Sequence, residues 1–132
     1  MTSNLKIIRV RDFVKVTPQG TFDFAKAKQD MREASVVPGM FVNYDLLIDT
    51  RGAEVNLSTT DIWYLATELA SLVDAHTKGY RAKVPVMCAT KDFNHAEFFE
   101  LCSQNRGMNV RAFTSFEDLF DWLSQPSEVN ND

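Results

Sequence analysis

Residues 44–62 read YDLLIDTRGAEVNLSTTDI and contain a strand, a loop and the start of a helix. The short unbroken apolar run Leu46-Leu47-Ile48 is typical of a strand that is covered on both faces of a parallel sheet. Ser58 and Asp61 then place a hydroxyl and a carboxylate three residues apart, which is the spacing of a capping box at a helix start. This order of elements favours an α/β fold.

The rest of the 132-residue chain extends the same alternation of strands and helices. The pattern predicts the order β-β-α-β-α-β-α-β-α, with a mixed, mostly parallel sheet of about five strands and about four helices. An N-terminal hairpin of strands 5–10 and 13–17 is expected to supply the antiparallel part. Helices are expected over 22–35, 58–76 and about 94–106, with a last helix over 116–123, and further strands over 83–89 and 109–113. A single domain over 1–124 and a polar, disordered tail over 125–132 are predicted.

Apolar spacing predicts which helical side chains are buried. In the helix over 94–106 the buried side is expected to hold Phe98, Leu101 and Cys102. In the last helix, Trp122 is expected to lie off the buried stripe.

Composition excludes several classes of function. The formal charge is −4 and the basic residues are scattered, which argues against nucleic-acid binding. No stretch resembles the apolar part of a signal peptide or approaches the roughly 18 residues of a membrane span, so no membrane insertion is expected. Cys88 and Cys102 have no metal-binding spacing and lie among apolar residues, as free thiols do in a reducing cytoplasm. No metal and no cofactor is predicted.

Polar residues follow two of the predicted parallel strands. In open α/β sheets, ligands bind beyond the carboxyl ends of such strands. We therefore expect one rim there, which forms a candidate ligand or partner site together with the start of the helix over 58–76. The candidate residues are Asp49, Arg51, Ser58, Thr59, Thr60, Trp63, Lys91 and His95.

Ser58 has two interpretations from its residue type and position. It could be a nucleophile, with His95 as base and Asp49 or Asp92 as orienting group. However, the strained Gly-x-Ser-x-Gly turn of serine hydrolases is absent. Similar starts at Asn94–Glu97 and Thr114–Glu117 favour a helix cap at Ser58. The sequence therefore predicts no enzyme.

The order of elements and residues 48–62 resemble the STAS domains, and most of all the SpoIIAA-like group of small stand-alone bacterial proteins. In anti-sigma-factor antagonists of this group, a strand ends in Ile-Asp-Ser-Ser-Gly-Leu and the first Ser is phosphorylated. Asp49, Gly52 and Ser58 match this pattern, whereas Leu57 and Thr60 depart from it. The resemblance implies a phosphorylation switch at Ser58 or Thr59, against which these two departures count. A looser similarity extends to Thr21–Phe24, Leu47–Arg51, Val110–Phe113 and Trp122-Leu123.

The resemblance implies a non-catalytic regulatory or protein-interaction module of the bacterial cytoplasm. Its partner would be another protein or a second copy of the chain, bound through the helix over 58–76 or the loop over 36–44. Trp63 and Tyr64 are candidate interface anchors, or alternatively cover the edge of the core. The alternative function is a small-ligand domain for a lipid or a nucleotide, with Val37, Met40 and Phe41 lining the pocket. A serine hydrolase is the third hypothesis.

Overall fold

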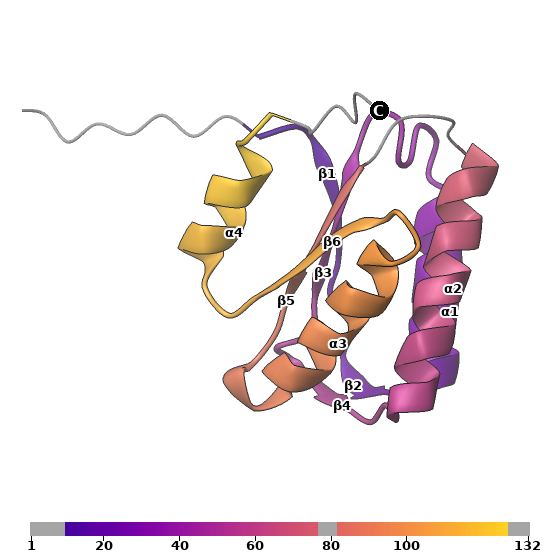
Figure 1. Ribbon diagram of the computed structural model, residues 1–132, viewed down its shortest axis with the longest axis vertical. Helices are drawn as coiled ribbons and strands as arrows, with labels where there is room; N and C mark the ends of the chain where they lie inside the picture. Colours follow the sequence, from indigo (N-terminus) through magenta and orange to yellow (C-terminus); the bar gives the residue numbers. More distant parts are fainter. Residues whose placement is uncertain (1–9, 77–81, 127–132) are drawn as a thin grey trace, which may run out of the picture.

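The computed structural model describes residues 10–76 and 82–126, and its centre is a parallel sheet of four strands (Figure 1). The strands lie in the order β1-β3-β5-β6 and comprise β1 (Phe13–Val16), β3 (Asp45–Asp49), β5 (Lys83–Met87) and β6 (Asn109–Phe113). The expected α/β class with four helices and a mostly parallel sheet is confirmed. Every strand pair among the described residues is parallel. The predicted first hairpin strand lies almost entirely outside the described residues, as does most of the predicted tail.

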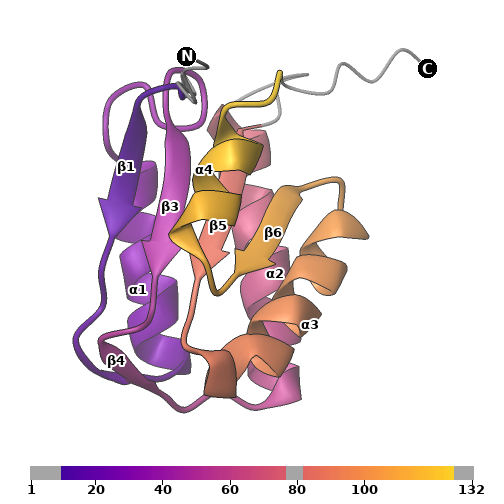
Figure 2. The same ribbon diagram turned by 90° about the vertical axis from the view of Figure 1, so that its left-hand side faces the viewer.

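Helices cover both faces of this sheet. The helices α1 (Phe24–Ser35), α2 (Thr59–His76) and α3 (Phe93–Gln104) lie on one face, and α4 (Phe116–Leu123) lies on the other (Figure 2). All five residues of β3 and all five of β5 are consequently buried. This arrangement explains the unbroken apolar run, because Ile48 faces α1–α3 while its neighbour Leu47 packs in a core with α4.

A second, two-stranded sheet was not expected from the sequence. It pairs β2 (Gly20–Phe22) with β4 (Ala53–Val55) in parallel, beyond the carboxyl ends of the main strands. The backbone N–H of Asn56 donates to the carbonyl oxygen of Phe22 at 3.0 Å and extends the pairing. This small sheet brings Phe22 close to the loop that leads into α2.

The structure corrects two predictions about burial. Leu101 is 54% exposed, and Phe99 is buried on α3 in its place, together with Cys102. Trp122 is only 7% exposed, since α4 packs against the sheet with Leu119, Trp122 and Leu123 buried. Its ring lies 5.6 Å from that of Phe113 in β6, measured between ring centroids.

The helix starts differ from one another. Asp23 caps α1 and Ser115 caps α4 by accepting hydrogen bonds from the backbone of Lys26 and Asp118. The capping box predicted at Asn94 is wrong, because a 3₁₀ turn, η1 (Thr90–Asp92), leads into α3 and Asp92 occupies the N-cap position. The Asp92 side chain makes no capping hydrogen bond. Its carboxylate is therefore available for another role.

Candidate functional site

Ser58 lies at the exposed start of α2 and caps that helix. Its hydroxyl accepts a hydrogen bond from the backbone N–H of Asp61 at 3.1 Å, and its own N–H donates to Asp61 Oδ2 at 3.0 Å. These reciprocal bonds are those of a capping box. Thr59 and Thr60 follow in the first turn of α2, and both are exposed.

Asp49 and Arg51 form a local ion pair at the end of β3. The Arg51 guanidinium donates to both carboxylate oxygens, with Nε at 3.0 Å and Nη2 at 2.9 Å, and the Arg51 backbone N–H donates as well. The hydrogen bonds from the Arg51 side chain hold the pKa of Asp49 below its ordinary value, and the charge of Lys15 at 3.7 Å contributes. Arg51 also lies over the ring of Phe116 in α4, 4.2 Å from its centroid.

The predicted rim is therefore divided between the two faces of the sheet. The contacts with Phe116 place Asp49 and Arg51 on the α4 side, as the alternation of strand residues requires. Ser58 and His95 belong to the helices on the opposite face. The structure does not bring all of the predicted site residues together.

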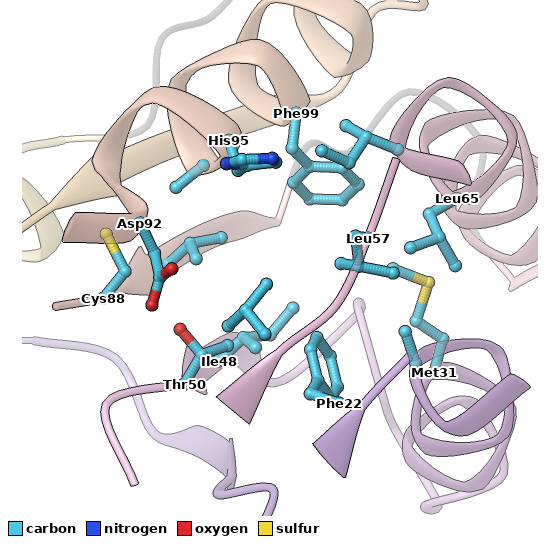
Figure 3. Close-up of a pocket in the computed structure, with 15 residues that line it drawn as sticks. Phe22, Met31, Ile48, Thr50, Leu57, Leu65, Cys88, Asp92, His95 and Phe99 are labelled. Carbon is cyan, nitrogen blue, oxygen red and sulfur yellow. The ribbon is translucent and has the colours of Figure 1, made fainter. Parts of the chain in front are cut away.

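An apolar cavity lies on the α1–α3 face, beyond the carboxyl ends of β3 and β5 (Figure 3). Its volume is about 60 Å³. The walls come from the four strands β2–β5, the loop before α2, and the helices α1, α2 and α3, and include Phe22, Ile48, Leu57, Ile62 and Phe99. Of the predicted site residues, His95 lines this cavity. Val37, Met40 and Phe41, the predicted pocket residues, are not among those that line this cavity, and Met40 and Phe41 pack in the larger core.

Four polar side chains also line the cavity: Thr50, Cys88, Asp92 and His95. Thr50 donates from its backbone N–H to the carbonyl oxygen of Met87 at 2.8 Å, which fixes the residue against β5. Burial raises the pKa of the Cys88 thiol to about 11, and the negative charge of Asp92 adds to the effect.

Asp92 has an unusual environment for a carboxylate. Its Oδ2 atom is buried and has no hydrogen-bond partner among the described residues. Figure 3 shows its carboxylate beside Thr50 and Cys88, on the opposite side of the cavity from Met31 and Leu65. From the sequence, Asp92 was proposed only as a possible orienting group for His95. Its position in the short segment after an apolar strand, close to the strand end as Thr50 is, was the available signal for the cavity.

A second surface feature lies further along α2. Trp63 is 45% exposed and Tyr64 is 54% exposed, and their rings meet edge to face at a centroid distance of 5.0 Å. The guanidinium of Arg106 lies over the Trp63 ring at 4.7 Å. We call Trp63 and Tyr64 the aromatic pair.

Two kinds of feature are absent from residues 10–76 and 82–126. No helix there has the length and apolar composition needed to cross a membrane. No group of three or more His, Cys, Asp or Glu side chains within those ranges could hold a metal ion.

Comparisons with known proteins give one structural match. No protein-family model matches the chain, and no curated protein sequence does. The chain is similar to the crystal structure of an uncharacterised protein of the DUF3478 family from Shewanella loihica PV-4, which is described as having a SpoIIAA-like fold. The two share 17% sequence identity over 93% of this chain and 98% of that chain, with a TM-score of 0.49.

Proposed function

We propose that the chain is a non-catalytic regulatory module of the cytoplasm that binds a protein partner through the aromatic pair on α2. The observation that carries this proposal is the exposure of two adjacent large aromatic side chains, Trp63 and Tyr64, on a well-formed helix. Tryptophan, tyrosine and arginine are the residues most enriched among those that dominate binding energy at protein interfaces. Arg106 completes such a set beside Trp63.

The neighbourhood of Trp63 supports its role as a rigid anchor. Arg106 Nε donates to the hydroxyl of Thr67 at 3.1 Å, and Nη1 donates to the carbonyl oxygen of Cys102 at 2.7 Å. These bonds hold the guanidinium in place over the indole ring. Less side-chain entropy is then lost when a partner covers Trp63, which favours binding.

The test replaces the aromatic pair and leaves the core intact. We expect the Trp63→Ala/Tyr64→Ala variant to lose a partner that wild-type protein retains in chemical crosslinking followed by mass spectrometry. Leu101→Ala is the matched control, because Leu101 is an exposed apolar side chain on α3. Light scattering on purified protein separates a second copy of the chain from a different protein as the partner. A folded double variant with the same crosslinked proteins and the same mass in solution would contradict the proposal.

The cavity favours a second candidate function, that of a small-ligand binding domain. It is lined mainly by apolar side chains and contains a few convergent polar groups, a combination that is typical of ligand sites. Solution NMR of methyl groups tests this function. A ligand that enters the cavity is expected to shift the signals of Ile48, Leu57 and Ile62, and unchanged methyl signals across a diverse ligand set would contradict it.

A further inference from the structure

We propose that the cavity binds a small molecule with an apolar body and one protonated amine, with Asp92 as the counter-ion. This inference rests on the small-ligand function and adds the chemical class of the ligand. It is carried by the buried, unpartnered Oδ2 atom of Asp92, a residue at the wall of a mainly apolar cavity.

The carboxylate of Asp92 lacks the partners that carboxylates at helix starts usually have. Asp92 occupies the N-cap position of α3, yet its side chain makes no hydrogen bond to the first turn of that helix. A buried acceptor that makes no hydrogen bond is unfavourable, and the cost is larger for a charged group. Because Oδ2 is buried, the Asp92 side chain has to turn toward the cavity before a ligand donor can reach this atom and remove the cost. The site is therefore prepared for a hydrogen-bond donor.

The negative charge of Asp92 favours a cationic hydrogen-bond donor over a neutral one as the ligand group. None of the described residues that line the cavity is a lysine or an arginine, and Asp92 is the acidic residue among them. The other two ionisable side chains at the cavity are Cys88 and His95, and His95 is exposed. A phosphate or carboxylate ligand would meet Asp92 without a fixed positive charge to balance it. A nucleotide or an anionic lipid is thus disfavoured, whereas an ammonium group gains a charge-assisted hydrogen bond.

Thr50 supplies a second acceptor on the same side of the cavity. Its hydroxyl can donate to the carbonyl oxygen of Met87, at a donor–acceptor distance of 3.4 Å. The lone pairs of the hydroxyl oxygen can therefore accept from a ligand. An ammonium group carries three N–H donors, so it can donate hydrogen bonds to Asp92 and Thr50 at the same time.

The size of the cavity limits the apolar part of the ligand. The volume of about 60 Å³ is far below that of a drug-sized site, which is on the order of 300–1,000 Å³. Leu57 and Phe99 border the cavity opposite the polar side. A short alkyl group fits this space, and a long lipid chain does not. We therefore choose four-carbon probes.

The experiment compares three probes of the same length and different charge: n-butylamine, 1-butanol and butyrate. Each is titrated into the full chain at neutral pH while methyl signals of Ile48, Leu57 and Ile62 are followed by NMR. We expect n-butylamine to bind with the lowest Kd. Asp92→Asn should raise that Kd by at least about tenfold, as for loss of a charged hydrogen bond, and should leave the Kd for 1-butanol unchanged within about twofold.

A control variant and the alternative outcomes distinguish the amine proposal from the more general small-ligand function. Glu97→Gln removes one negative charge from an exposed position on the same helix and should not change the Kd for n-butylamine. Equal binding of the three probes, or an Asp92→Asn variant that binds n-butylamine as wild type does, would overturn the amine proposal and leave the small-ligand function standing. If none of the three probes shifts the cavity methyls, the amine proposal is overturned, and the small-ligand function is overturned as well when the diverse ligand set also leaves them unchanged.

Discussion

The ammonium group of Lys83 donates to the carbonyl oxygen of Trp122 at 2.9 Å, joining the start of β5 to the end of α4. It also donates to the carbonyl oxygens of Leu123, at 3.5 Å, and Gln125. The last carbonyls of a helix have no partner within the helix, and the helix dipole makes that end favourable for a cation. Lys83 is buried. These hydrogen bonds provide acceptors for its ammonium group and hold α4 against the sheet.

Replacing Lys83 with methionine should loosen α4. Lys83→Met keeps much of the side-chain volume but removes the donors for carbonyl groups at the end of the helix. We expect the free energy of unfolding to fall by about 1–3 kcal/mol, the usual cost of buried polar groups without partners. Urea unfolding measures this change, and hydrogen exchange should show faster exchange in α4. Lys91→Met is the control, since Lys91 is exposed, and an equal loss of stability in both variants would refute the role of Lys83.

Removing the cap of α2 should have a smaller effect. Ser58→Ala leaves the backbone N–H of Asp61 without its side-chain acceptor. We expect a loss of about 1 kcal/mol in the free energy of unfolding, measured by urea denaturation. Thr59→Ala is the matched control, because Thr59 is the exposed first residue of the helix and should change stability much less. Equal effects of the two substitutions would show that the cap contributes little.

The ion pair of Asp49 and Arg51 should make stability depend on pH in the acid range. The pKa of Asp49 is lowered in the folded protein, so its stabilising contribution is complete above the unfolded pKa, near 3.8, and is lost as the pH falls through the folded value. Arg51→Met should raise the pKa of Asp49, measured by NMR titration of the carboxyl carbon. The variant should also lose less stability than wild type between about pH 5 and pH 2. An unchanged carboxyl titration would contradict the assignment of the shift to Arg51.

The thiol of Cys88 should be protected from alkylation. Its pKa is raised from 9.0 to about 11, and the reactive species is the thiolate. At a given pH near neutrality the thiolate fraction is thus about 100-fold lower than for an ordinary cysteine. We expect iodoacetamide to label Cys88 at least about 100-fold more slowly in folded than in urea-unfolded protein, as followed by peptide mass spectrometry. Similar rates in the two states would rule this out.

The fold was largely predictable because its signals are local. The run Leu46-Leu47-Ile48 indicated a strand that is covered on both faces, and the structure places helices on both. The strands β2 and β4 were missed because three residues are too few to show a period of two. Trp122 was misplaced because its burial depends on tertiary contacts with Lys83, which is distant in sequence, and with Phe113 in the neighbouring strand.

The candidate site was less predictable because it depends on side-chain direction. Asp49 and Thr50 are adjacent at the end of β3, yet one pairs with Arg51 on the α4 side and the other lines the cavity. Successive side chains of a strand point to opposite faces of the sheet. The rim predicted from sequence position alone therefore grouped residues that lie on two different faces. Asp92 was identifiable as polar and close to the strand end. Its lack of a capping bond was visible only in three dimensions.

Among the residues that the structure describes, the two faces of the sheet have separate apolar cores, which share strands but no side chains. The larger core includes Phe22, Ile62 and Phe99, near the cavity, whereas the smaller one joins Leu47, Met87 and Phe113 to α4. A substitution in one core therefore does not directly change the apolar side-chain packing of the other. The residues around α4 can diverge during evolution without changing the lining of the cavity, and the cavity can change without changing how α4 packs.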